Sequence, residues 1–249
     1  MKSKPDPSHK NNESNLLIRE LRWALRAQAD PAKAAAMQAY MKSTMPYYGI
    51  QATEQRRIYR EIFSQHPLES FESWSHTVLA LWRSAQFREE RYAALELIGR
   101  KCYADFRTLA CLPLYEEIIV TGAWWDTVDH VAIHRLGELL RHYPRQMKME
   151  MRTWSRCDDL WKRRSAILCQ ISFKRDTDQS LLYACIQPAL GNREFFLRKA
   201  IGWALRQYAR VDPHEVIRYV TEKRDELSGL SKREALKHPL RTGLIDALP

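Results

Sequence analysis

The chain has 249 residues, of which 45% are hydrophobic, and its 40 basic residues outnumber its 30 acidic ones. This hydrophobic fraction excludes an intrinsically disordered chain, and the length is sufficient to bury a substantial core. The net charge of +10 favours a nucleic acid or another anionic surface as partner, although a soluble protein can also be basic without one.

The cysteines and the lengths of the apolar stretches indicate in which cellular compartment the protein is expected. Five cysteines, without any CxxC spacing, predict neither a disulfide framework nor a zinc site, and favour a reducing interior. Residues 1–15 are polar and lack the apolar run of a signal peptide. No apolar stretch approaches the roughly 18 residues that a membrane span needs. We therefore expect a cytoplasmic protein that does not contact a membrane.

Helical patterns cover almost all of the sequence beyond residue 15. Only 8 glycines are present, and no sustained alternation typical of strands occurs. We expect a disordered polar tail at 1–15 and a single domain at 16–249. The predicted helices are, roughly, 16–29, 32–40, 53–64, 71–83, 89–103, 106–121, 124–141, 147–155, 160–173, 179–190, 193–209, 213–227 and 232 onward.

A weak repeat accompanies the second member of each predicted helix pair. It reads arginine, any residue, a small or β-branched residue, then an aliphatic residue or alanine, and its copies begin at Arg91, Arg164, Arg198 and Arg233. A further copy begins at Asp129, where an acid replaces the arginine. The five starting positions are 38, 35, 34 and 35 residues apart. This spacing predicts an all-α, HEAT-like helical-repeat solenoid, an α–α superhelix in which equivalent positions form a ladder.

The segment Trp124-Trp125-Asp126-Thr127-Val128-Asp129 places aromatic surface beside a negative charge. In a helix, Trp125 and Asp129 lie four residues apart on one face. This combination suits a cationic ligand, which is unusual in a basic chain. The ladder also predicts that Asp129 and Arg164 are near neighbours. Two alternatives stay open: Asp126 caps the helix with Asp129 in its first turn, or Arg164 forms an intramolecular salt bridge with Asp129 or another acid.

Several segments together resemble the DNA alkylation repair glycosylases of the AlkD type. They are Tyr40-Met41-Lys42, the Trp-Trp-Asp-Thr-Val-Asp segment, Arg164-Ser165-Ala166-Ile167-Leu168, the segment from Phe195 to Arg206 containing Lys-Ala-Ile-Gly-Trp, and Leu230-Ser231-Lys232-Arg233-Glu234-Ala235. The resemblance runs in the same order from about residue 16 to about residue 238. The tail before Leu16 and the loop after Gly49 look different from the family or longer.

The resemblance implies a solenoid whose concave basic face holds duplex DNA and removes N3- and N7-alkylated purines, without metal or organic cofactor. The catalytic aspartate of the family matches Asp129, its two catalytic tryptophans match Trp125 and Trp203, and its active-site tyrosine matches Tyr40. Its phosphate-contacting arginine matches Arg164. We expect a monomer that contacts double-stranded DNA through Arg164, Arg206, Lys199, Phe195, Phe196 and Arg57.

This chemistry is consistent with the residues themselves. Alkylation at N7 or N3 makes a purine cationic and a good leaving group, so no general acid is needed. Asp129 would stabilise the oxocarbenium-like sugar and orient a water. Trp203 lies off the predicted apolar stripe of its helix, beside Lys199 and Arg206, although a tryptophan is more often a core residue.

Two other interpretations need weighing. His130 and His134 are four residues apart, but no third ligand accompanies them, so the sequence does not predict a metal site. The alternative function is a non-catalytic HEAT-type scaffold that binds a nucleic acid or an acidic protein. Asp129 argues against that alternative, because an acid at the centre of a basic groove repels phosphates.

Overall fold

The structure, a computed structural model, describes the backbone of residues 7–248 and the side chains of residues 14–248. Throughout the described residues the regular elements are helices, and no strand occurs among them. The chain divides into two compact units, Met1–Leu114 and Tyr115–Pro249. No helix in the described part is both long and apolar enough to cross a membrane. The predicted all-α solenoid of helix pairs is confirmed, whereas a single domain over 16–249 stays a prediction.

Unit 1 begins earlier than predicted. Helix α1 spans Pro7–Ala27, so residues 7–15 of the expected disordered tail lie in a helix, and residues 1–6 lie outside the described residues. The polar composition of this segment argues against burial but not against helix, and a proline is tolerated in a first turn. The remaining α-helices that lie wholly in unit 1 are α2 (Pro31–Met41), α3 (Ala52–Gln65), α4 (Phe71–Ser84) and α5 (Arg88–Gly99).

A buried carboxylate holds the loop between α2 and α3. Glu89, fully buried on α5, accepts hydrogen bonds from the backbone N–H groups of Tyr48, Gly49 and Ile50 at 2.9–3.2 Å. Gly49 has a φ of +88°, and a Cβ there would lie 2.1 Å from the carbonyl oxygen of Asp30. Only glycine fits this position, because the left-handed conformation and the close approach both exclude a side chain.

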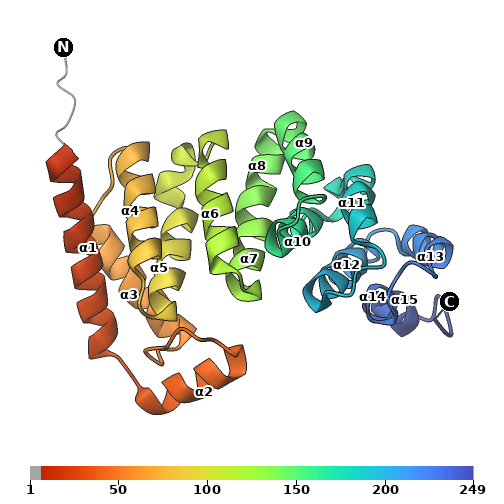
Figure 1. Cartoon of the computed structure of the whole chain (residues 1–249), viewed down its shortest axis with the longest axis horizontal. Coiled ribbons are helices and arrows are strands. Elements are labelled where there is room, and N and C mark those ends of the chain that lie inside the picture. Colours follow the sequence, from red (N-terminus) through yellow and green to blue (C-terminus); the bar gives the residue numbers. More distant parts are fainter. Residues whose placement is uncertain (1–6, 249) are drawn as a thin grey trace. The chain divides into compact units, whose positions relative to one another are not determined.

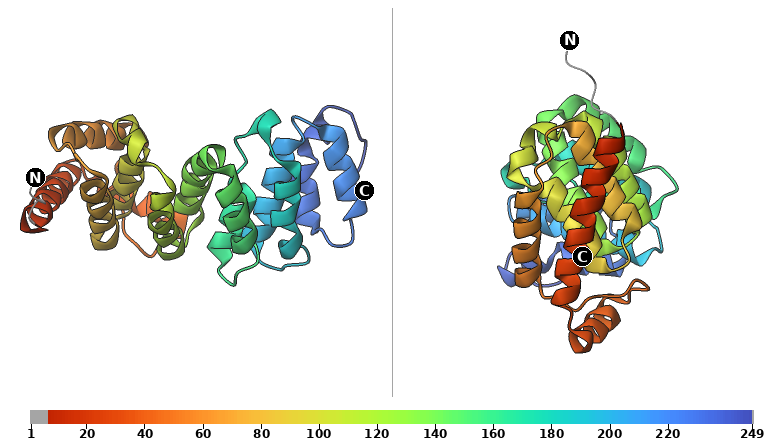
Figure 2. Two further views of the ribbon diagram at one scale, coloured as in Figure 1. Left: turned by 90° about the horizontal axis from the view of Figure 1, so that it is seen from above. Right: turned by 90° about the vertical axis from the view of Figure 1, so that its left-hand side faces the viewer.

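Unit 2 continues the pattern of helix pairs (Figures 1 and 2). Its α-helices are α6 (Leu112–Gly122, which begins at the boundary), α7 (Trp125–His130), α8 (Gly137–His142), α9 (Pro144–Trp154), α10 (Leu160–Leu168), α11 (Gln179–Ile186), α12 (Phe195–Tyr208), α13 (Pro213–Glu222), α14 (Gly229–Ala235) and α15 (Lys237–Arg241). A π-helical segment, η3 (Val131–Leu136), joins α7 to α8 with helical backbone at both junctions. The predicted helix 124–141 is thus one continuous helix whose middle segment, η3, is π-helical.

Prolines explain two places where the helices are shorter than predicted. The expected helix 106–121 has Pro113 in its interior, where it would break a backbone hydrogen bond and clash with the preceding turn. Instead, α6 begins at Leu112 after the short 3₁₀ helices Lys101–Phe106 and Leu109–Cys111, so Pro113 falls in its first turn. Similarly, α11 ends at Ile186, and Pro188 lies in the 3₁₀ helix Gln187–Ala189.

The repeat copies lie on the second helix of successive pairs, as predicted. Their first positions fall on α5, α7, α10, α12 and α14, which follow α4, α6, α9, α11 and α13. On α12 the predicted apolar stripe is buried at Leu197, Ala200, Ile201 and Ala204, which are at most 4% exposed, whereas Tyr208 at its end is half-buried. Neighbouring second helices pack against each other, α7 and η3 against α10, α10 against α12, and α12 against α14.

Candidate functional site

Asp129 lies one turn into the helix that the two tryptophans begin. Trp124 is the N-cap residue of α7, without a capping bond from its side chain, and Trp125 is the first helical residue. The alternative in which Asp126 caps this helix is therefore wrong, because the helix starts two residues earlier and leaves Asp126 within its first turn. Trp125 and Asp129 share one face of α7, as predicted. Asp129 is buried and Trp125 is half-buried.

Both carboxylate oxygens of Asp129 accept hydrogen bonds from Arg164 on α10. Nε donates to Oδ1 at 2.7 Å and Nη2 donates to Oδ2 at 2.8 Å. The third nitrogen of the guanidinium, Nη1, donates to the backbone carbonyl of Phe196 at 2.5 Å. Asp129 is 9% exposed and Arg164 is 5% exposed, so this bidentate ion pair is nearly withdrawn from water. The prediction that the two residues are neighbours is confirmed, and the salt bridge between them is present.

Burial and the ion pair act on the Asp129 carboxyl in opposite directions. Loss of solvation raises the pKa of Asp129 above its usual range, because a charged carboxylate is less stable away from water. The hydrogen bonds and the charge of Arg164 oppose the rise in this pKa, and the nearby Asp126 adds to it. A carboxyl whose pKa burial and a specific partner perturb together is the kind of group that functional sites contain.

Aromatic rings gather next to this ion pair. The ring centroid of Phe196 lies 5.5 Å from that of Trp124 and 4.9 Å from that of Trp161. The guanidinium carbon of Arg164 lies 5.8 Å from the centroid of the Phe196 ring. Phe195, next along α12, is 51% exposed and makes an edge contact with Phe196. We name Trp124, Trp161, Phe195 and Phe196 the aromatic cluster.

The cluster contains one residue that the sequence analysis missed. Trp161 is the second residue of α10 and only 9% exposed. The repeat could have identified it, because Trp161 precedes Arg164 by three residues and so lies one helical turn before the ladder position.

Trp203 lies on α12 with basic neighbours on its own side. It is half-buried, as are Lys199 and Arg206, the residues one turn before and after it. Both of these cations contact Glu234 of α14, where Lys199 Nζ lies 3.3 Å from Oε1 and Arg206 Nη1 lies 2.8 Å from Oε2. Lys237 also reaches Oε1 at 2.7 Å. Glu234 therefore balances part of the positive charge predicted for DNA contact.

Sequence reasoning missed Glu234, although the repeat spacing could have indicated it. Lys199 and Glu234 are 35 residues apart, as are Asp129 and Arg164, so both are cross-repeat pairs. Gly202 brings their helices together. A Cβ at Gly202 would lie 2.5 Å from the Cβ of Glu234 and 3.0 Å from the carbonyl oxygen of Ser231. Figure 2 shows α12 and α14, in two shades of blue, side by side.

The other two predicted site residues, Tyr40 and Arg57, belong to unit 1. Tyr40 lies near the end of α2 and is 80% exposed. Arg57 lies on α3, where its guanidinium pairs with Glu54 at 2.5 Å and with Glu61 at 3.3 Å. Both side chains are thus on the surface of their own unit.

The two histidines that follow Asp129 differ in exposure, since His130 is half-buried and His134 is exposed. The ring centroids of His130 and His134 are 5.1 Å apart. Burial first, then the charges of His134 and Arg135, lower the pKa of His130 to about 4. Burial and Arg135 also lower the pKa of His134. Among the described residues, no group of three histidine, cysteine or acidic side chains could hold a metal ion.

The fold and the site together define a class of protein: a helical-repeat chain with excess positive charge, in which the buried acid Asp129 lies near a cluster of aromatic rings. The family model for DNA alkylation repair enzymes matches residues 21–238. The chain therefore belongs to the DNA alkylation repair enzyme family, which supports a role in the repair of alkylated DNA and implies DNA as its partner.

A solved structure and the curated proteins complete the comparison. The solved structure is described as a predicted DNA alkylation repair enzyme from Enterococcus faecalis. It is 28% identical, with a TM-score of 0.77 over 85% of this chain and 96% of the other. No curated protein matches this chain.

Proposed function

We propose that this chain is a monofunctional DNA glycosylase that hydrolyses the N-glycosidic bond of cationic N3- and N7-alkylated purines in duplex DNA. The observation that carries the proposal is Asp129: a buried carboxylate fixed by Arg164, one turn from Trp125, in a chain of net charge +10. Membership in the alkylation repair family supports the substrate class.

Asp129 is the group that we propose acts on the sugar. An alkylated purine leaves with its electron pair and needs no proton, so the sugar that remains develops positive charge. A carboxylate held in a dry site stabilises that charge and can orient the attacking water. Arg164 occupies two acceptor positions of the carboxylate, and an ionised carboxylate has about four such positions. Acceptor positions therefore remain for a water.

Trp125 and Trp203 are proposed to favour the cationic nucleotide. The face of a tryptophan ring attracts a cation by roughly 0.5–2 kcal/mol, and more when water is excluded. Both residues are half-buried, so each ring keeps surface that a ligand could cover. Tyr40 and Arg57 keep the roles that the resemblance implies for them as predictions.

We propose that α12 supplies much of the contact with the DNA strand. Phe195 is the exposed member of the aromatic cluster, and Lys199 and Arg206 follow along the helix. Glu234 holds both cations in defined positions, which lowers the conformational entropy that they lose on binding a phosphate. Arg164 has five N–H groups, of which three are engaged within the protein, leaving two for a phosphate oxygen.

One observation favours a second candidate, a non-catalytic nucleic-acid-binding scaffold. Asp129 and Arg164 satisfy each other in a buried bidentate pair, as residues with a purely structural role do. Under this alternative, the acid does not repel phosphate because its charge is already balanced. The two candidates differ in whether any base is released.

The test is incubation of the protein with methylated duplex DNA and quantification of free 7-methylguanine and 3-methyladenine. We expect release by the wild-type protein, and a loss of about two orders of magnitude or more in Asp129→Asn, because one well-placed electrostatic partner is worth on the order of 10²–10³ in rate. Release by Asp129→Asn at the wild-type rate would remove this residue from the mechanism. DNA binding without any release by the wild type would favour the scaffold.

The control has to separate chemistry from folding. Asp129→Asn leaves the buried Arg164 without its charge partner, which typically destabilises a protein by about 3–5 kcal/mol. Rates are therefore compared at a temperature at which circular dichroism shows that both proteins are folded. Asp126→Asn is the matched variant, because it removes an acid from the same helix and is expected to keep most of the activity.

A further inference from the structure

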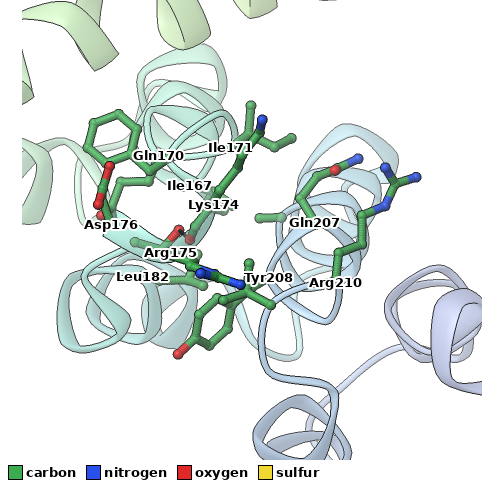
Figure 3. Close-up of a pocket in the computed structure, with 14 residues that line it drawn as sticks. Ile167, Gln170, Ile171, Lys174, Arg175, Asp176, Leu182, Gln207, Tyr208 and Arg210 are labelled. Atoms are coloured by element: carbon green, nitrogen blue, oxygen red, sulfur yellow. Dashed lines mark hydrogen bonds between the residues drawn. The ribbon is translucent and has the colours of Figure 1, made fainter.

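A cavity of about 500 Å³ lies in unit 2 away from Asp129 (Figure 3). It is formed where α10 and α12 end, together with the loop that leads to α11. The lining residue of α12 that comes first after Phe196 is Ala204, eight residues later, and a helix rises about 1.5 Å per residue, so about 12 Å of helix separates the cavity from the Phe196 end of the aromatic cluster. None of the proposed catalytic residues lines this cavity.

Positive charge surrounds the cavity. Lys174 and Arg175 come from the loop and Arg210 from the turn after α12. None of these three cations forms an ion pair within the part of the chain whose side chains are described. The acid in the lining, Asp176, lies 3.3 Å from Arg141, which partly balances its charge. The lining thus carries a net positive charge that an anion could neutralise.

The loop that carries two of the cations is held in place. The side-chain amide of Gln170 donates to the carbonyl oxygen of Asp178 at 3.2 Å, and its side-chain oxygen accepts from the N–H of Asp178 at 2.8 Å. The hydroxyl of Thr177 donates to the carbonyl oxygen of Lys174 at 2.7 Å. Lys174 itself adopts a φ of +55°, a conformation that is uncommon for a residue other than glycine. Strained backbone of this kind is found where surrounding structure maintains it, often at ligand sites.

The rest of the lining is apolar or aromatic. Ile167, Leu182, Ala204 and Val211 contribute aliphatic surface, and Tyr208 adds an aromatic ring to the lining (Figure 3). Burial, with Asp212 and Glu215, raises the pKa of Tyr208, so its hydroxyl stays protonated and can donate a hydrogen bond.

The two nearby acids are engaged elsewhere. Asp212 caps α13 by accepting a hydrogen bond from the N–H of Glu215, and the Glu215 carboxylate pairs with Arg218. They therefore offset little of the positive charge at the opening.

We propose that this cavity binds a nucleoside 5′-monophosphate, with the phosphate against Lys174, Arg175 and Arg210 and the base against Tyr208 and the aliphatic floor. Guanidinium and ammonium groups are the usual partners of phosphate, and aromatic side chains stack on bases of any sequence. The volume falls within the range of small-ligand sites. The occupant is either a free nucleotide or a nucleotide at the end of a DNA strand, since both present the same groups.

The test measures binding of deoxyadenosine 5′-monophosphate by isothermal titration calorimetry. We expect wild-type protein to bind it with a Kd below about 1 mM, and deoxyadenosine or inorganic phosphate alone to bind at least about tenfold more weakly, because each lacks one half of the contacts. The double variant Arg175→Glu/Arg210→Glu is expected to raise the Kd for the nucleotide by about tenfold or more. Arg175 and Arg210 are both exposed to solvent, so their replacement does not disturb the core.

The matched control is Arg145→Glu, an exposed residue of α9 outside the cavity, which is expected to leave the Kd unchanged. No nucleotide binding by the wild type up to about 1 mM, or equal binding by wild type and double variant, would overturn the proposal. A Kd that rises equally in Arg145→Glu would also overturn it, because the effect would then come from net charge.

A further measurement distinguishes the two sources of the nucleotide. The affinity for a short duplex with a 5′-phosphate is compared with the affinity for the same duplex without it. A preference for the phosphorylated end that disappears in the double variant assigns the cavity to a strand end. The absence of a preference, with nucleotide binding retained, assigns it to the free nucleotide. Neither result depends on base release, so a failure of the glycosylase proposal is scored separately.

Discussion

The ion pair between Asp129 and Arg164 is the salt bridge that the sequence leaves open as an alternative to the separate roles implied by the resemblance. Asp129 was expected to face a cationic sugar, and Arg164 was expected to face a phosphate. In the structure each is the other's main partner, since both carboxylate oxygens lie within 2.8 Å of the guanidinium. If the proposed chemistry is correct, Arg164 also sets the charge state of Asp129, because its hydrogen bonds and charge lower a pKa that burial raises.

This interaction predicts how base release depends on pH. In the proposed chemistry Asp129 acts in its ionised form, so we expect release to fall as the pH drops through its pKa, which lies above the usual aspartate range. Replacing Arg164 with Gln removes the interactions that lower this pKa. The fall in the release rate at low pH, the acid limb of the pH–rate profile, should therefore move to higher pH. Single-turnover release rates between pH 4 and pH 8 check this. An acid limb that does not move would mean that Asp129 is not the group that titrates.

The same variant tests the phosphate contact. If the two remaining N–H groups of Arg164 bind a phosphate, Arg164→Gln should weaken binding to duplexes of any sequence and lower the slope of log K against log salt by about one. Arg145→Gln serves as the control for a lost surface charge. An unchanged slope together with a moved acid limb would make Arg164 a positioning residue for Asp129 alone.

At the scale of elements, α12 and α14 depend on close approach at one glycine. A Cβ at Gly202 would lie 2.5 Å from the Cβ of Glu234, so Gly202→Ala has to move α14. A Cβ atom is fixed to the backbone and cannot rotate away as the end of a long side chain can. Overpacking of this kind lowers the free energy of unfolding by about 1–3 kcal/mol. The shift would also move Glu234 relative to Lys199 and Arg206.

We expect Gly202→Ala to lower the free energy of unfolding in urea and to weaken DNA binding. Gly99→Ala is the matched control, because a Cβ there meets nothing within 4 Å and alanine is the better helix former by about 0.5–1 kcal/mol. Gly99→Ala should therefore be neutral or stabilising. Equal stabilities of the two variants would contradict the close packing of α12 against α14.

In the continuous helix formed by α7, η3 and α8, the lowered pKa of His130 leads to a second prediction, on stability at low pH. Its pKa is lowered to about 4 from the usual 6.5, because burial disfavours the charged ring. Above pH 6.5 the ring is neutral in the folded and unfolded chain. As the pH falls from 6.5 toward 4, the unfolded chain binds a proton that the folded chain does not, so stability is lost, by about 3 kcal/mol once the pH is below 4.

We therefore expect His130→Gln to reduce the loss of stability between pH 7 and pH 4, as measured by urea unfolding at each pH. The charged and titratable neighbours, Arg135 and His134, remain in place in this variant. His214→Gln is the control, because His214 is exposed on α13. If both variants lose as much stability as the wild type, the protonation of His130 does not govern acid sensitivity.

For the whole molecule, the prediction that separates an alkylpurine glycosylase from other glycosylases concerns the charge of the lesion. We expect release of cationic 7-methylguanine and 3-methyladenine but not of two neutral bases, hypoxanthine, a purine of similar size, and uracil, a smaller pyrimidine. A neutral base is a poor leaving group, and none of the proposed site residues is placed to protonate one. Chromatography of bases freed from matched duplexes checks this. Efficient excision of uracil or hypoxanthine would mean that a general acid operates in the site.

Periodic features of the protein could be predicted from its amino-acid sequence. The spacing of about 35 residues placed the helix pairs in order and made Asp129 and Arg164 neighbours, because equivalent positions of stacked repeats meet. The 3.6-residue period of a helix put Trp125 on the face of Asp129 and identified the buried stripe of α12. Both periods are properties of the chain that do not depend on which hydrogen-bond or ion-pair partner any one side chain has.

The pairing of long side chains could not be predicted in this way, because it depends on how separate helices pack. Lys199 and Arg206 read as free cations in the sequence, and their partner Glu234 became evident only because Gly202 allows α14 to approach. Likewise, the three N–H groups of Arg164 could have met several acceptors, and the choice of Asp129 and the Phe196 carbonyl follows from the packing of α10 against α7 and α12. The loop that lines the cavity near Tyr208 is closed by the hydrogen bonds between Gln170 and Asp178, which no helical periodicity contains. Such pairings depend on distances of a few ångströms between separate helices, and periodicity fixes only which faces meet.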